Sequence, residues 1–421
     1  MLVKYILLCA VVMFFVSSPL KANDLDVEFS GFATLTMSYS DNSDVSFSAN
    51  YLNTSEAGFS FRRDSLIGGQ ANITINNKWD AVVQVIYQDR TIKSFDSFLE
   101  LAFIRYRPHR NWILRAGRLN SDLYLISEYN YVGYAYLWAR PPHGYYSFAS
   151  TAGHYDGVNV EYNNQVNDGF LRINLSAGQT TPKLIAGNAK LRVTYDDLYI
   201  ASFVYVIDEW TFRATAAKTN FSNFESAPFN YLIDGLNAIA PTGIWPQAAE
   251  FAHGFEYQHH KINYSALGIA YDDTNWLVQA ELGSATSGWT AVPSNTSAYL
   301  SVGYRVNEMT FFGGVSIAKN KKNTQKMVIP EALSDLPSSQ SQEMATLISN
   351  TDLAIKRSSA DQKSINLGAK WYYSDKLVFK LQVDHFMIKP SGAGLWDLKN
   401  LSAVDHAHNV NLVSFSANVV F

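Results

Sequence analysis

Long stretches of the chain alternate between apolar and polar residues. In the segment 79–88 the odd positions are apolar, whereas the even positions include Asp80, Gln84 and Gln88. The same alternation recurs in further segments, at 170–178, 210–216, 276–282 and 377–384. Because successive side chains of a strand point to opposite faces, each segment is predicted to be a β-strand with one apolar and one polar face.

Seven short polar segments separate the strand-like stretches, and each is followed by Trp or another apolar residue. They are 76–78, 108–111, 163–169, 208–209, 272–275, 307–308 and 374–376. The stretch before the turn often ends in Tyr, as at Tyr106, Tyr162 and Tyr271. Amphipathic rings favour the headgroup region of a bilayer, so this pattern predicts a membrane interface. Seven hairpins plus one strand at each end give 7 × 2 + 2 = 16 strands, and single-chain bacterial barrels have even counts.

The segment 190–207 contains Asp196-Asp197, which suits a turn as well as a strand. A turn there would change the parity of the strand count and would leave 220–252 without a matching strand. We therefore predict one long strand over 190–207.

Three connections are long, namely 119–152, 220–252 and 319–362. In bacterial outer-membrane barrels the short turns face the periplasm and the longer loops lie outside, so these segments are expected on the outer face. Met344, Leu347 and Ile348 have helical spacing, which predicts a helix over 343–356.

The composition fits a barrel better than a soluble protein. Charged residues make up 17% and aromatic residues 14% of the chain, and the mean hydropathy is −0.09, whereas soluble domains carry about 25% charged residues. No apolar stretch after residue 22 is long enough for a transmembrane helix. A closed barrel can still span a membrane. A soluble β-sandwich would alternate too, but the aromatic turns and the N-terminal segment favour the barrel.

Residues 1–22 are predicted to be a secretory signal peptide. Lys4 precedes an apolar run at 6–16, which is too short to span a bilayer as an anchor, and Ala22 is the expected cleavage site. The chain's one cysteine, Cys9, lies in this segment, so the mature domain at 23–421 is expected to have no disulfide. Removing Lys4 and Lys21 changes the net charge from −4 to −6, which argues against a nucleic-acid partner.

Several motifs resemble the N-terminal half of proteobacterial outer-membrane porins. They are Phe61-Arg62-Arg63 with Gly68, the run Glu100 to Pro108, and Leu114-Arg115-Ala116-Gly117-Arg118. The last strand, ending in Phe421, matches the general pattern of outer-membrane proteins. The resemblance implies an all-β transmembrane antiparallel barrel of 16 strands, in contact with outer-membrane lipid and assembled as a homotrimer. It also implies that the third loop folds into the barrel and that the barrel assembly machinery recognises the strand ending in Phe421.

The resemblance makes 119–152 the constriction loop, and alternation selects charged residues for the inner wall. The loop candidates are Asp122, Glu128, Arg140, Tyr124 and Tyr131. The basic wall candidates are Arg115, Arg172, Arg213, Arg305, Lys370 and Lys380. The acidic ones are Glu28, Asp80, Glu100, Glu161, Glu281 and Asp384. Opposed charges at a constriction filter small polar solutes by size and charge, but six basic against six acidic residues indicate neither anion nor cation preference.

Other sites are less favoured by the sequence. The aromatic residues of 119–152 could form a stacking track for sugars, but their irregular spacing favours packing against the wall. His259-His260 and Asp384-His385 are adjacent pairs, and adjacent side chains of a strand point apart, which argues against a metal site and a catalytic pair. The sequence has no recognisable serine-triad, zinc or phosphate-loop motif.

The sequence therefore predicts a porin without a cofactor, not an enzyme, that admits small hydrophilic solutes and ions by passive diffusion. Two alternatives stay open: a channel selective for a sugar or small anion, and an outer-membrane barrel enzyme or adhesin that uses its loops.

Overall fold

The computed structural model describes residues 25–48, 57–149, 152–186, 189–258, 260–320 and 327–421. The predicted signal peptide at 1–22 and His259 lie outside these residues.

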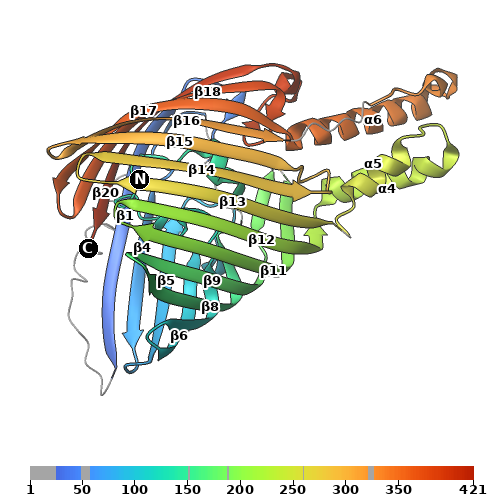
Figure 1. The fold of residues 1–421 in the computed structure, drawn as a ribbon. Helices are drawn as coiled ribbons and strands as arrows, with labels where there is room; N and C mark the ends of the chain where they lie inside the picture. Colours follow the sequence, from blue (N-terminus) through green and yellow to red (C-terminus); the bar gives the residue numbers. More distant parts are fainter. Residues whose placement is uncertain (1–24, 49–56, 150–151, 187–188, 259, 321–326) are drawn as a thin grey trace.

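Sixteen long antiparallel strands form a closed barrel (Figure 1), which confirms the predicted fold class and strand count. They are β1 (Asp26–Ser40), β4 (Leu66–Thr74), β5 (Trp79–Gln88), β6 (Leu99–His109), β7 (Trp112–Asn120), β8 (His154–Val166), β9 (Gly169–Thr180), β11 (Ala189–Ile207), β12 (Trp210–Glu225), β13 (Lys261–Asp272), β14 (Trp276–Ser287), β15 (Asn295–Val306), β16 (Met309–Asn320), β17 (Ala360–Ser374), β18 (Leu377–Ala393) and β20 (His408–Val420). The barrel closes where β1 pairs with β20, from Phe32 opposite Val420 to Ser40 opposite Leu412.

Four shorter strands lie at the barrel's edges. β3 (Gly58–Ser60) pairs with β1, and β10 (Lys183–Ala186) pairs with β11. β2 (Val45–Ser46) and β19 (Asp397–Leu398) form a separate two-stranded sheet.

All seven predicted short turns connect neighbouring strands. Asn167, Asp208 and Asn307 open two-residue turns with φ of 51°, 47° and 53°, a left-handed conformation that Asn and Asp tolerate better than most residues. The turn predicted over 163–169 is shorter than expected, because β8 continues to Val166 and β9 begins at Gly169.

The two aspartates in β11 form a bulge and not a turn, so the prediction of one strand is confirmed. The pairing with β12 shifts between Asp196 and Tyr199, and Asp197 has a φ of 48°. The bulge inserts one extra residue, which changes the parity of the strand. Before the bulge the odd-numbered residues Val193 and Tyr195 are buried, whereas after it the even-numbered residue Leu198 is buried.

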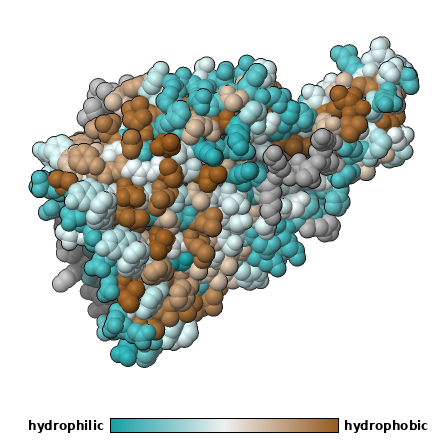
Figure 2. Space-filling model, turned by 45° about the horizontal axis from the view of Figure 1, so that its top comes forward, coloured by the Kyte–Doolittle hydropathy of each residue, from teal (hydrophilic) through white to brown (hydrophobic). Residues whose placement is uncertain are grey.

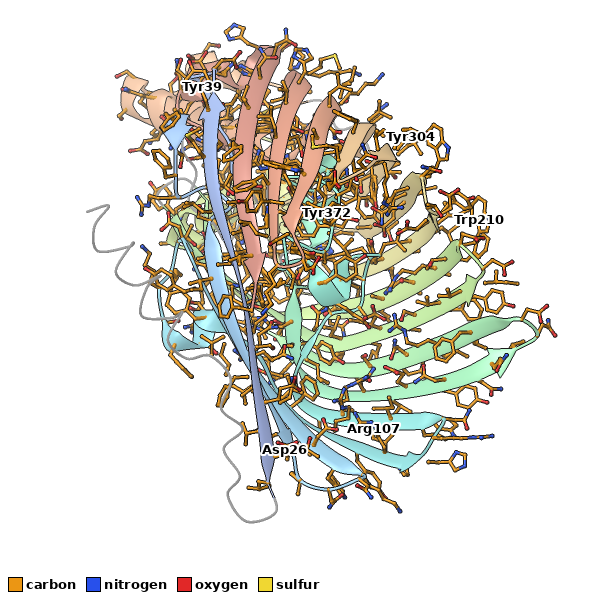
Figure 3. All side chains as sticks on the ribbon, turned by 90° about the vertical axis from the view of Figure 1, so that its left-hand side faces the viewer. Asp26, Tyr39, Arg107, Trp210, Tyr304 and Tyr372 are labelled. Carbon is orange, nitrogen blue, oxygen red and sulfur yellow. The ribbon has the colours of Figure 1, made fainter. Side chains whose placement is uncertain are left out.

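The outer face of the barrel is apolar. Leu35, Leu267 and Leu367 are exposed there, and Figure 2 shows apolar side chains spread over the wall between more hydrophilic ends. At the short-turn end, Trp rings lie against Tyr rings of the neighbouring strand, as in Trp79–Tyr106 at 4.3 Å and Trp276–Tyr304 at 4.7 Å between ring centroids. These pairs form the predicted aromatic girdle, and Figure 3 shows Trp210 and Tyr304 on its rim.

Helices occur in the connections. They are α2 (Phe95–Phe98), η1 (Ser127–Tyr129), α3 (His143–Ala149), α4 (Ala227–Ile239), η3 (Ala240–Thr242), α5 (Ala248–Phe255), η4 (Glu331–Asp335), α6 (Ser338–Ser358) and η5 (Leu401–Asp405). The helix predicted over 343–356 is confirmed within α6. In the described part of the chain, no helix is long and apolar enough to cross a membrane.

Helices α4, α5 and α6 project from the end of the barrel opposite the short turns (Figure 1), and we call them the helical arm. They share an apolar core that includes Leu236, Trp245, Phe251, Phe255 and Met344. The arm is therefore a packed extension of two loops.

Candidate functional site

Residues 121–149, here called the inner segment, lie against inward-facing side chains from several strands. The backbone N–H of Leu125 donates to Glu281 on β14 at 2.8 Å. The indole N–H of Trp138 donates to Ser301 on β15 at 2.9 Å, and the N–H of Ala139 donates to Gln382 on β18 at 2.9 Å. The segment thus occupies the interior of the barrel, where the resemblance placed the third loop.

Two lysines of the wall hold the backbone of the inner segment. Lys380 donates to the carbonyls of Tyr136 and Trp138 at 2.7 and 2.6 Å and also to that of Gly133. Lys370 donates to the carbonyl of Tyr134 at 2.9 Å. Among the residues that the structure describes, no carboxylate lies within ion-pair distance of either ammonium. Lys370 is 3% exposed and Lys380 is 1% exposed, so both buried lysines anchor the inner segment.

A cluster of tyrosines surrounds Glu281 on β14, where the inner segment contacts a second part of the wall. Tyr145 and Tyr146 of α3 and Tyr299 of β15 donate their hydroxyls to this carboxylate at 3.2, 2.5 and 2.9 Å. Burial raises the pKa of Tyr145 and Tyr146 far above the usual range, and the nearby Glu281 raises it further, so both hydroxyls stay protonated as donors. With the Leu125 N–H, the carboxylate has four donors, which compensates the cost of burying it.

Two acidic residues of the inner segment pair with predicted wall arginines. Asp122 contacts Arg213 at 2.6 Å and also accepts from Ser202. Burial would raise the pKa of Asp122, but Arg213 and Ser202 hold it below its usual value. Glu128 contacts Arg172 at 2.7 Å, and here the side chains are 55% and 25% exposed. The pair Asp122–Arg213 is therefore largely shielded from water, whereas the pair Glu128–Arg172 is exposed to it.

Arg140 joins the inner segment to the seam between β18 and β20. It forms an ion pair with Asp64, lies 3.9 Å from Asp384 and donates to Ser414 at 3.1 Å. Its guanidinium also stacks 4.3 Å from the centre of the Phe47 ring.

The neighbouring His143 is fully enclosed. Its Nε2 lies 3.0 Å from the carbonyl of Ser48, and its Nδ1 lies 3.4 Å from the amide nitrogen of Gln362. Burial, with a smaller effect of Arg140, lowers the pKa of His143 to about 3. The neutral ring can satisfy both contacts, with Nε2–H as donor and Nδ1 as acceptor.

The remaining predicted residues contact neighbours within the wall or near it. Arg115 pairs with Glu161 at 2.7 Å, and Arg305 pairs with Asp272 at 2.7 Å near the short turns. Glu100 pairs with Arg90 at 3.1 Å, and Arg90 also lies 3.5 Å from the Tyr131 hydroxyl. Tyr124 is buried, and its hydroxyl accepts a hydrogen bond from Asn130 at 3.0 Å. Asp80 pairs with Arg105 at 2.8 Å. Glu28 is exposed.

Sequence reasoning missed several contacts of the interior. Gln382, Ser301 and Tyr299 bind the inner segment but were not selected, because only charged residues were taken from the inward positions. Alternation alone would have placed all three on the inner face. The pairing of Glu281 with Tyr145 and Tyr146 had no local signal, since the residues are 136 and 135 positions apart.

The side chains of the adjacent pair Asp384-His385 lie apart. Asp384 accepts from Gln382 at 2.8 Å, whereas the ring of His385 lies 2.8 Å from Asn411, so the two side chains point apart as expected. In the described ranges, no three His, Cys, Asp or Glu residues lie close enough together to hold a metal ion.

A cavity of about 1940 Å³ lies on the arm side of the inner segment, and we call it the vestibule. Leu123 and Ser147 of the inner segment line it, together with the ends of β11, β12 and β13 and residues of α4 and α6. A solute from the arm side would meet this cavity before the inner segment.

Comparison with solved structures shows the fold of outer-membrane porins. An anion-selective porin from Comamonas acidovorans matches with a TM-score of 0.51 at 10% identity, covering 94% of this chain and 100% of that chain. The outer membrane channel DcaP of Acinetobacter baumannii matches with a TM-score of 0.53 at 11% identity, covering 96% and 100%. The trimer form of OmpT from Vibrio cholerae matches with a TM-score of 0.51 at 9% identity, covering 95% and 100%. No family model and no curated protein sequence matches the chain.

Proposed function

We propose that the protein is an outer-membrane porin that admits small hydrophilic solutes and ions by passive diffusion. The observation that carries this proposal is a closed barrel with an apolar outer face, whose polar interior is narrowed by a segment of the same chain. A barrel of this size encloses a lumen unless something fills it. Here the inner segment occupies part of the lumen, as expected of a size filter.

The charged residues divide into two proposed roles. Arg115, Arg172 and Glu128 are partly exposed in the interior, at 19%, 25% and 55%, so we assign them to the conducting path. Lys370 and Lys380 are enclosed by backbone carbonyls, so we assign them to holding the constriction in place. Since the exposed charges of both signs are paired, we expect weak ion selectivity.

The same features support a proposed location and assembly. The aromatic girdle and apolar wall suit outer-membrane lipid. Phe421 exchanges backbone hydrogen bonds with Gly31 at 2.8 and 2.9 Å, so the last residue completes the seam between β20 and β1. We propose that the barrel assembly machinery recognises this strand. The trimer form among the similar structures supports a homotrimer.

The helical arm supports a second candidate function, that of adhesin or receptor. It projects from the barrel as a packed unit, and Tyr231 on α4 and Ile329 in the connection before α6 are strongly exposed. This role is compatible with transport. Deleting 331–358 and measuring both conductance and cell binding would separate the two functions.

Planar-bilayer recording tests the porin proposal. Purified protein should give stepwise conductance increases, and on gels it should run as an oligomer that heating dissociates. Protein that is folded and inserted, as judged by its heat-dependent mobility, yet gives no conductance steps would contradict the channel function and favour an enzyme or adhesin.

A further inference from the structure

The inward-facing residues of β11, β12 and β13 change character along the barrel. Near the middle they are mixed, with the polar residues Ser202, Arg213 and Thr215 and the apolar residues Ile200 and Val204. Towards the arm they become apolar, with Val193 on β11, Phe224 on β12 and Ile262 on β13. Inward positions of a water-filled barrel are normally polar. The arm-side end of this wall therefore departs from what a purely hydrophilic channel needs.

The arm continues the same apolar surface around the vestibule. The apolar residues that line the cavity from outside these strands include Leu123, Leu232, Trp289, Met344, Leu347, Trp396 and Leu398. They come from the inner segment, α4, α6 and two further connections, so the apolar lining surrounds the cavity. Ligand sites are mostly apolar concave surfaces of about 300–1,000 Å³, and this cavity has room for such a ligand with water.

Packing of the arm does not account for the whole lining. Val193, Phe224 and Trp289 belong to a buried cluster beneath α4, and they are needed there as core. Ile262 packs against the edge of this cluster and Leu347 against the core of the arm, but both are only half-buried, and both line the cavity. Their apolar surface faces the cavity, where contact with a ligand would remove it from water.

Charge gives the vestibule little preference of its own. Its charged lining residues are three basic and three acidic, namely Lys218, Arg357, Lys399, Asp234, Glu343 and Asp397. Lys399 and Asp397 pair with each other at 2.8 Å. The apolar surface is thus the feature that distinguishes one solute from another.

We infer that the vestibule is a binding site for small amphiphilic solutes, which dock an aromatic or aliphatic body on its apolar wall before they reach the inner segment. This inference rests on the proposed channel function and names its substrate class. A solute without an apolar part would pass the vestibule without being retained.

The test uses three anions of equal charge and increasing apolar size: acetate, phenylacetate and 1-naphthylacetate. Each is added to the arm side of single channels in a planar bilayer, and the block of the potassium chloride current is titrated. The blocking constant should tighten at least tenfold with each ring, the ratio that burial of about 60 Å² of apolar surface gives at ~25 cal/mol per Å². Calorimetric titration of the protein in nanodiscs, corrected with empty nanodiscs, gives the affinities independently of conduction.

Matched substitutions locate the site. Ile262→Thr and Leu347→Gln should each weaken 1-naphthylacetate at least fourfold, about the effect of one buried methylene. Val204→Thr is the control, because Val204 is also buried on β11 but does not line the vestibule. Val204→Thr should keep the wild-type conductance and block, and all three variants should keep the wild-type gel mobility.

The outcomes separate this inference from the channel proposal. Conductance steps with equal block by the three anions would overturn the vestibule site and leave the porin function standing. Ring-dependent block that neither Ile262→Thr nor Leu347→Gln weakens would also overturn it, because the site would lie elsewhere. Ring-dependent calorimetric affinity without conductance would retain the site and contradict the porin function.

Discussion

The inner segment meets two different walls of the barrel. On the lysine wall, formed by β17, β18, β20 and β1, the wall residues are dry: Lys380, Ser416 and Asn418 are at most 1% exposed. On the arginine wall, formed by β7, β8 and β9, Arg115 and Arg172 are partly exposed and paired with carboxylates. The lysines bind neutral carbonyls, whereas the arginines bind charged groups. One wall therefore holds the constriction, and the other borders the proposed conducting path.

The largest effect is expected on the lysine wall, from Lys380→Met. The substitution removes the donor shared by the carbonyls of Gly133, Tyr136 and Trp138, and of these only Tyr136 keeps a contact with Lys370, at 3.2 Å. Each unsatisfied buried group costs about 1–3 kcal/mol, so the inner segment should detach for much of the time. Single-channel recordings should show larger and noisier steps. Lys376→Met, in an exposed turn, is the control and should leave the steps unchanged.

Gly133→Ala should loosen the same wall by a smaller amount. An added Cβ would lie 2.1 Å from the side-chain oxygen of Asn418 and 2.7 Å from the hydroxyl oxygen of Thr34. Such overpacking typically costs about 1–3 kcal/mol. We expect more frequent conductance fluctuations in bilayers. Gly69→Ala is the matched control, because no heavy atom lies within 4 Å of its added Cβ, and equal fluctuation in the two variants would contradict the proposed contact.

Acidification should loosen the lysine wall through His143. Its pKa is about 3 when buried, against about 6.5 when free, so the detached segment binds a proton more readily than the attached one. Attachment is therefore full above pH 6.5 and weakens as the pH falls towards 3, by up to about 1.4 kcal/mol per unit. Recordings at pH 7 and 5 should show more fluctuation at pH 5. A His143→Gln channel whose response to pH equals that of the wild type would assign the effect to another group.

On the arginine wall, Arg172→Glu should change the attachment of the inner segment least. It should nevertheless change the ion selectivity clearly. Arg172→Glu puts a carboxylate beside Glu128, so the reversal potential in a salt gradient should shift towards cations. Step noise should stay at the wild-type level, since Arg172 does not hold the backbone of the inner segment. Arg192→Glu, an exposed residue on β11, is the charge-matched control. An unchanged potential for Arg172→Glu would place this side chain outside the conducting path.

The strands could be predicted because their signal is local. The period of two and the polar turns are visible within ten residues, and they gave the correct strand count. The helix α4 was not predicted within 220–252, although Pro228 and the spacing of Leu232, Leu236 and Ile239 were available signals.

The contacts of the inner segment could not be predicted in the same way. Trp138 and Ser301 are 163 positions apart, and Gly133 and Lys380 are 247 apart. A lysine that donates to carbonyls has no characteristic sequence neighbour, so alternation could place Lys370 and Lys380 on the inner face but could not distinguish an anchor from a charge in the channel. That distinction depends on which side chains the inner segment covers.

The bulge at Asp196-Asp197 has an evolutionary consequence. It adds one residue to β11 without exchanging the lipid and interior faces of the rest of the strand. A strand with such a site can gain or lose one residue while its two halves keep their separate solvents. Insertions and deletions absorbed in this way would shift the residue-by-residue correspondence between barrels while the fold stays the same. Tolerance of this kind is one physical route by which chains of this fold can differ to identities near 10%.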